Sequence, residues 1–97
     1  MKDFIRAQIE RHWYLDKSAL RAGSSPVAIH MLLNRDGRVD KAEIVDDPRF
    51  AADPAFYALA LSARNAVLLS SPLTLPPGRY DAVKDMILDF DPRKALQ

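Results

Sequence analysis

Two histidines and several acidic residues are the side chains of this chain that could carry out catalysis or bind a metal. His12 and His30 could each transfer a proton or ligate a metal ion. No further His, Cys or paired carboxylate stands at ligand spacing from either of them, and the chain has no cysteine at all. Thiol catalysis, disulfides and Cys-based zinc sites are therefore excluded. We interpret His12 as an exposed helical residue and His30 as a residue on the outer face of a sheet.

The acidic residues near the first Asp-Gly pair do not have the spacing of a calcium loop. An EF-hand loop places oxygen ligands at alternate positions, followed by a glycine and a distal glutamate. Here Gly37 directly follows Asp36, and Arg38 stands at a ligand position. The three glycines form neither a phosphate-binding loop nor a nucleophile elbow. We expect no cofactor, no metal and no enzymatic activity; the alternative is a small-molecule-binding or enzymatic domain that uses His30 and Asp85.

The composition is that of one small globular domain spanning residues 1–97. Its 48% hydrophobic and 28% charged residues lie in the ordinary range. A chain of this length buries roughly 60–65% of its unfolded surface. The 14 Lys and Arg residues are dispersed and the net charge is +1, which argues against a nucleic-acid partner. No apolar run reaches the roughly 20 residues that cross a bilayer, so we expect no membrane contact by this domain. We also expect the domain to be a binding module and to be monomeric.

Residues 27–45 are predicted to form a β-hairpin around which the rest of the chain is organised. Apolar residues at alternate positions over 27–33 give the period-2 pattern of a strand with one buried face. The Asp36-Gly37 pair supplies a turn that tolerates positive φ. The return strand follows over 39–45, where apolar residues stand among charged ones. Two such runs around Asp-Gly are a strong short-range signal for a hairpin.

Two helices flank the hairpin in the sequence. The first is predicted over 3–14, with Asp3 as its N-cap and Trp13 anchoring it on the sheet, where the indole N–H needs a partner. The second begins at Asp53-Pro54, a capping residue followed by proline at the first helical position, and ends near residue 69. Because it is so apolar, we expect it to lie flat on the sheet and to be covered on more than one side.

The segments between these elements are predicted to be irregular. Residues 15–26 are rich in turn formers, with one short helical turn at Ala19-Leu20. Residues 70–78 contain three prolines, which exclude a regular helix and favour a stiff, extended connector. The last residues, 93–97, are expected to form a helical turn or a tail.

A third strand is predicted over 83–90, and Asp91-Pro92 ends it. Alternation places every second side chain on one face, and the more continuous apolar set, which we assign to the core, is Met86, Leu88 and Phe90. The order α-β-β-α-β predicts an α+β fold with two layers, a three-stranded antiparallel sheet packed by two main helices. Only a long helix and a proline-rich connector join the third strand to the hairpin, so we expect it at an edge of the sheet.

An edge strand exposes unpaired backbone N–H and C=O groups that can pair with an extended peptide. We therefore predict that a partner's extended segment binds to the third strand by β-augmentation. Tyr80 and Lys84 would flank the contact, and the charges of Asp85 and Asp89 would discourage indiscriminate pairing. The predicted partner-binding residues are Tyr80, Val83, Lys84, Asp85, Met86, Ile87, Leu88 and Asp89.

Four sequence segments, taken together, resemble a known family. They are LLNRDGRV at 32–39, AEIV at 42–45, LTLPPGRY at 73–80 and DMILDFDP at 85–92. With the apolar positions of the first helix and the alanine-rich second helix, they resemble the C-terminal domain family of TolA and TonB, closer to TolA. The chain departs from that family at Asp46-Asp47-Pro48, where a Ser-Ser-Gly often stands.

The resemblance implies a function in the cell envelope. A TolA-like domain would be the periplasmic end of an inner-membrane protein with a single span, whose anchor and stalk lie outside these 97 residues. It would belong to the Tol-Pal system, which maintains the outer membrane and its constriction at division. Its partners would be TolB and Pal, and such domains also dock colicins and filamentous phage coat proteins, commonly at a sheet edge. A TonB-like role, energy transduction to outer-membrane transporters, is the alternative.

Overall fold

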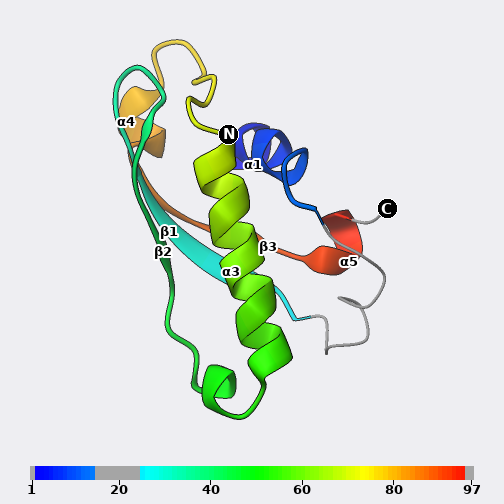
Figure 1. The fold of residues 1–97 in the computed structure, drawn as a ribbon. Helices are drawn as coiled ribbons and strands as arrows, with labels where there is room; N and C mark the ends of the chain where they lie inside the picture. Colours follow the sequence, from blue (N-terminus) through cyan, green and yellow to red (C-terminus); the bar gives the residue numbers. More distant parts are fainter. Residues whose placement is uncertain (1, 15–24, 96–97) are drawn as a thin grey trace.

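The computed structural model describes residues 2–14 and 25–95 and has the predicted α+β fold (Figure 1). Its three strands form one sheet in the order β2-β1-β3, and both pairings are antiparallel. The elements in chain order are α1 (Lys2–Glu10), β1 (Val27–Leu33), β2 (Val39–Ile44), η1 (Pro48–Ala51), α3 (Pro54–Leu69), α4 (Tyr80–Val83), β3 (Asp85–Phe90) and α5 (Pro92–Ala95). The helical turn predicted at Ala19-Leu20 lies outside the described residues.

Two helices cover one face of the sheet. The long helix α3 contacts β2 and β1, whereas α1 contacts α3 and β3. In Figure 1, α3 therefore lies between β2 and α1. The core fills the space between these helices and the sheet. Across residues 2–14 and 25–95, no helix has the length and apolar content needed to cross a membrane.

The hairpin is confirmed, and its turn depends on Gly37. The Gly37 N–H donates to the Asn34 carbonyl at 2.9 Å, and the Asn34 N–H donates to the Arg38 carbonyl at 2.8 Å. Gly37 has φ +90°, which an L side chain rarely adopts. The Leu73 N–H also donates to the Gly37 carbonyl at 2.7 Å, so the proline-rich segment packs directly on this turn.

The helix predicted from Asp53-Pro54 is confirmed from its cap to its end at Leu69. The Asp53 carboxylate accepts a hydrogen bond from the Phe56 N–H at 3.1 Å, and Pro54 occupies the first turn. The helix lies on the sheet and also contacts α1 and η1, so it is covered on more than one side as expected, although part of its surface remains exposed. Its exposed large apolar residues are Tyr57, Leu68 and Leu69.

The first helix is shorter than predicted and ends at Glu10. Asp3 is not its N-cap, because the helix begins at Lys2; Asp3 instead pairs with Arg6 one turn later. Trp13 follows the helix but is buried as expected, with its ring edge-on to Phe90 at 5.8 Å between centroids. The expected partner of its indole N–H is the Ser62 hydroxyl, at 2.9 Å. Trp13 therefore ties α1 to both α3 and β3.

The third strand begins two residues later than predicted. Residues Tyr80–Val83 form a helical turn, and Lys84 caps it, so Val83 and Lys84 are not in the strand. Val83 was expected on the outer face but is fully buried. The turn is fixed by the Tyr80 hydroxyl, which donates to the Leu33 carbonyl at 2.8 Å. From Asp85 onward the alternation holds, and the core residues Met86, Leu88 and Phe90 are confirmed.

The remaining segments agree with the sequence. The connector after α3 contains no regular helix or strand up to Gly78, and within it the Leu73 side chain is buried in the core. After β3, the short helix Pro92–Ala95 is the expected helical turn.

Candidate functional site

Both β2 and β3 are edge strands, because β1 lies between them. The edge position predicted for the third strand is thus confirmed. The Val45 N–H donates to the Ala28 carbonyl at 3.0 Å, so the even-numbered residues of β1 direct their backbone groups to β2 and the odd-numbered ones to β3. The pairing registers then identify the residues whose backbone groups point away from the sheet. These are Ala42 and Ile44 in β2, and Asp85, Ile87 and Asp89 in β3.

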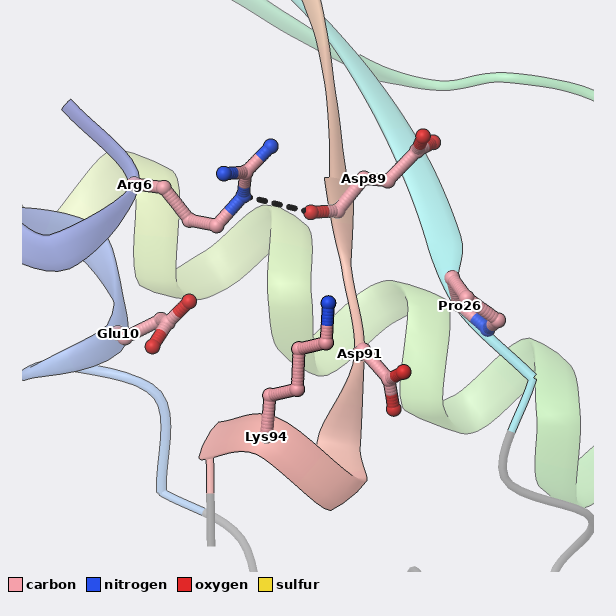
Figure 2. A pocket seen from close by; sticks show the side chains of 6 residues that line it. All are labelled: Arg6, Glu10, Pro26, Asp89, Asp91 and Lys94. Atoms are coloured by element: carbon pink, nitrogen blue, oxygen red, sulfur yellow. Dashed lines mark hydrogen bonds between the residues drawn. The ribbon is translucent and has the colours of Figure 1, made fainter. Parts of the chain in front are cut away.

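The outer edge of β3 is partly occupied by side chains of α1. The Arg6 Nε donates to the Asp89 carbonyl at 2.9 Å, and the Lys2 Nζ lies 3.5 Å from the Ile87 carbonyl. Figure 2 shows Arg6 reaching from α1 to the strand. A peptide that paired with β3 would have to displace these donors. The charges of Asp85 and Asp89 remain exposed, as the sequence suggested.

A polar hollow of about 280 Å³ lies beside the end of β3 (Figure 2). Charges of both signs from α1, β3 and the segment after β3 line it, together with Pro26 just before β1; the charged residues are Arg6, Glu10, Asp89, Asp91 and Lys94. Partial burial acts to raise the pKa of Asp91, but hydrogen bonds from Arg93 and the charges of Arg93 and Lys94 lower it overall. This carboxylate therefore stays ionised near neutral pH.

Among the described residues, the outer edge of β2 is engaged by a hydrogen bond at its beginning alone, where the Val39 N–H donates to the Ser71 hydroxyl at 3.0 Å. Beyond the other end lies a shallow, open hollow of about 450 Å³. Phe50 and Tyr57 line it and pack edge to face, with 5.2 Å between their ring centroids. The side chains of Ala42 and Ile44 face the core but are only half-buried.

An ion pair between Asp47 and Arg49 lies in the segment that follows β2. The Arg49 Nη2 lies 2.5 Å from the Asp47 carboxylate, which also accepts the Arg49 backbone N–H at 2.9 Å. These hydrogen bonds lower the pKa of Asp47 to about 2 and raise that of Arg49. The guanidinium in turn lies over the Phe56 ring, 4.5 Å from its centroid.

His30 and Asp85, which the sequence suggested as a catalytic or ligand-binding pair, are in contact. The His30 Nε2 lies 2.6 Å from the Asp85 carboxylate, on the sheet face opposite the helices. Glu43 faces His30 in the register of β1 and β2 and pairs with Lys41 at 2.9 Å. In the described part of the chain, no group of three His, Cys, Asp or Glu residues could hold a metal.

The residues predicted to bind a partner divide into three groups. Val83, Met86 and Leu88 are buried and belong to the core. Tyr80 and Lys84 lie in or next to α4, and the Lys84 ammonium pairs with Asp81 at 3.4 Å. The remaining three, with exposed side chains on the outer face of β3, are Asp85, Ile87 and Asp89.

Sequence reasoning did not single out the outer edge of β2. Two features of the sequence pointed to this edge. The alternation in β2 is weak, with apolar side chains that are small or half-exposed, and one flank of α3 carries apolar residues. Neither could be recognised without knowing which strand lies at the second edge.

Comparison with known proteins shows a likeness of fold. No protein-family model and no curated protein matches the chain. Among solved structures, the chain is similar to the solution NMR structure of TolAIII bound to a peptide derived from the N-terminus of TolB. The two share 20% sequence identity with a TM-score of 0.59, and the match covers 95% of this chain and 72% of TolAIII. The chain therefore has a TolA-like fold.

Proposed function

We propose that this chain is a periplasmic protein-interaction domain of the Tol type, which captures an extended segment of a partner protein by β-augmentation. The observation that carries the proposal is the exposed sheet edge in a small domain with a TolA-like fold. Unpaired backbone groups at an edge bind an extended peptide through main-chain hydrogen bonds, and neighbouring side chains add selectivity. The solved TolAIII structure contains a peptide from the N-terminus of TolB, so a TolB-like segment is the first candidate partner.

The wider role follows from this proposal. The domain would be the periplasmic end of a single-span inner-membrane protein, binding TolB- and Pal-like proteins to maintain the outer membrane and its constriction at division. Colicins and phage coat proteins would exploit the same surface. The alternative role within this fold is TonB-like coupling to outer-membrane transporters.

The test is titration of the domain with the N-terminal peptide of TolB from the same organism, followed by calorimetry and by NMR of the backbone amides. Binding should protect outward-pointing amides of one edge strand from exchange with solvent. A scrambled peptide of the same composition is the control. Equal affinity for both peptides, or protection confined to residues away from both edges, would refute the proposal. Tighter binding of a peptide from an outer-membrane transporter would favour the TonB-like role.

The contact between His30 and Asp85 supports a second candidate, a small-molecule-binding or enzymatic function. A ligand bound there should raise the melting temperature of the domain, and His30→Ala should abolish the shift. A thermal-shift screen against metal ions and small metabolites, run on both variants, separates this function from peptide binding.

A further inference from the structure

We propose that the partner strand adds to the outer edge of β2 rather than to β3, and that an acidic side chain of the partner pairs with Arg64 of α3. This inference rests on the proposed function, since it names the edge and the chemistry of the segment that binds there. Four features of the molecule lead to it. The core-facing side chains of the two edge strands are unequally buried, and the outward backbone groups of the two strands are unequally hydrogen-bonded. One flank of α3 carries exposed side chains, and the buried Nε of Arg64 has no hydrogen-bond partner among the described residues.

The two edge strands differ in how well their core-facing side chains are buried. Ile29 of β1 is paired with Ile44 on one side and with Leu88 on the other. Leu88 is completely buried, whereas Ile44 is only half-buried. The two partners of Met31 differ in the same way: Ala42 in β2 is half-buried, whereas Met86 in β3 is buried. The core is therefore complete at β3 and open at β2, where a further strand would remove apolar surface from water.

The backbone groups of the two edges are also occupied unequally. Two of the outward carbonyls of β3 face donors from α1: Arg6 makes a hydrogen bond of ordinary length at 2.9 Å, and Lys2 lies at 3.5 Å. In β2, hydrogen bonding to the outer edge is confined, over the described residues, to the Val39 N–H. The outward groups of Ala42 and Ile44 are thus available for main-chain pairing without displacing a side chain.

The flank of α3 beside β2 carries a stripe of side chains that an added strand would contact. Ser62, which binds Trp13, marks the flank that faces α1. Residues spaced by three or four positions share one side of a helix, and the opposite flank carries Tyr57, Leu61, Arg64 and Leu68. Tyr57 and Leu68 are exposed by 43% and 47% of their surface. Because α3 packs on β2 and β1 and its Ser62 flank faces α1, we infer that the opposite flank lies on the side of the open edge.

Arg64 indicates the charge of the partner. Its Nε is buried and has no hydrogen-bond partner among the described residues. Leaving a buried donor of a charged group unpaired is unfavourable, and a carboxylate is the acceptor that a guanidinium binds best. Arg64 is also the only charged residue of α3. An Asp or Glu on the partner strand, directed toward α3, would supply the missing acceptor.

The hollow lined by Phe50 and Tyr57 lies where the open edge ends. It gives room for one apolar side chain of the partner to pack against these two aromatic rings. The segment that fits this surface is about five residues long and extended. Its side chains toward α3 are apolar except for one acid, and those on the other face are polar.

The first test uses matched proline substitutions at the two edges, Ala42→Pro and Ile87→Pro. Both residues point their N–H groups away from β1, so proline removes an outward donor and leaves the ladder with β1 in place. Affinity for the TolB N-terminal peptide is measured by calorimetry, after circular dichroism shows that each variant is folded. We expect Ala42→Pro to weaken binding about tenfold or more and Ile87→Pro to change it less than twofold.

The opposite result, loss of binding only with Ile87→Pro, would overturn the choice of edge and leave the proposed function intact. Loss with both variants to the same extent would also contradict a site confined to β2. If the wild-type domain binds neither this peptide nor other extended segments at an edge, the proposed function fails and this inference fails with it.

The second test does not require a change in the sheet. Arg64→Gln keeps a donor but removes the charge, and each Asp or Glu of the peptide is replaced in turn by its amide. One peptide substitution should weaken binding to the wild-type domain about tenfold and have almost no effect on Arg64→Gln. Lys84→Gln, at the β3 side, is the control and should leave affinity unchanged. If the loss of affinity caused by each peptide substitution were the same for the wild-type domain and for Arg64→Gln, the pairing with Arg64 would be refuted.

Discussion

The two edges of the sheet show how one small domain can leave one strand open to a partner and protect another. At β3, side chains of α1 reach two outward carbonyls, and the core residues beneath are completely buried. At β2, the outward backbone groups lie beside half-buried apolar side chains and an exposed flank of α3. Covering an edge with side chains is a common protection against indiscriminate pairing. Within residues 2–14 and 25–95, helix side chains give this protection to β3 alone.

The two edge strands lead into the same tripeptide, directly after β3 and two residues after β2. Each is followed by Asp-Pro-Arg, at Asp47-Pro48-Arg49 and at Asp91-Pro92-Arg93. In both places the aspartate accepts the backbone N–H of the arginine at 2.9 Å. These similar segments do not account for the difference between the edges, which lies in the burial of the core-facing side chains of each strand and in the helices packed on the sheet.

The largest effect is expected from Gly37→Val, which should disrupt the side of the molecule that carries β2. A Cβ at Gly37 would lie 1.9 Å from the Leu73 carbonyl oxygen, and the φ of +90° is unfavourable for a β-branched residue. We expect a loss of roughly 3–5 kcal/mol in the free energy of unfolding, measured by urea denaturation. Gly78→Ala is the control: its φ is +71° but its Cβ would meet no atom within 4 Å. Equal losses would show that the contact with Leu73 is unimportant.

Truncation of the two side chains opposite Ile29 tests the difference in burial. Leu88→Ala removes a completely buried side chain and should cost about 3 kcal/mol. Ile44→Ala removes a half-buried one and should cost about 1 kcal/mol, because part of its surface is already in water. Urea denaturation of both variants gives the comparison. Equal costs would mean that the core is as complete at β2 as at β3.

The sequence predicted the features that depend on near neighbours in the chain. The turn at Gly37 and the cap at Asp53 are formed by residues only a few positions apart, and both are where the sequence placed them. The start of the third strand was placed too early, because Val83 and Lys84 continue the alternation of β3 although a helical turn holds them. That turn depends on the Tyr80 hydroxyl reaching Leu33, which no local pattern reveals.

The candidate site was harder to predict for the same reason. The order of elements was enough to predict that the site is an exposed sheet edge. It could not predict that β3 is protected, because that protection depends on a contact between Arg6 and Asp89, which are 83 positions apart. Likewise, the flank of α3 that lies beside β2 is the one opposite Ser62, which accepts the Trp13 indole N–H. Which flank contacts Trp13 is decided by the packing of the whole domain and not by local sequence.

Removing the Arg6 side chain from the Asp89 carbonyl should leave the outward backbone groups of β3 as free as those of β2. Arg6→Met keeps an apolar stem over the strand but removes the donor to the Asp89 carbonyl, and we expect a loss of about 1 kcal/mol in stability. Hydrogen exchange at the Leu88 and Phe90 amides, which point toward β1, should become faster as this end of β3 loosens. Lys2→Met is the control, because its contact at 3.5 Å is at the limit of a hydrogen bond. A change no larger than that of the control would show that Arg6 does not protect this edge.

The smallest effect concerns the acidic residues that end the two strands. The folded-state pKa of Asp47, about 2, is below its ordinary value of 3.8 because of hydrogen bonds from the Arg49 side chain and backbone. A depressed carboxyl pKa stabilises the fold above the unfolded value, and that stabilisation is lost as the pH falls from about 3.8 through 2. The pair is exposed, so we expect a shift in titration with little change in global stability.

An NMR titration of the aspartate carboxyl groups measures this shift directly. Asp47 should titrate below Asp91, because the Arg49 guanidinium lies at 2.5–3.1 Å from its carboxylate whereas that of Arg93 lies at 3.5 Å from Asp91. Arg49→Gln should return the pKa of Asp47 toward 3.8 and leave Asp91 unchanged. If Asp47 titrates at its ordinary value in the wild type, the ion pair does not form in solution and does not constrain the segment after β2.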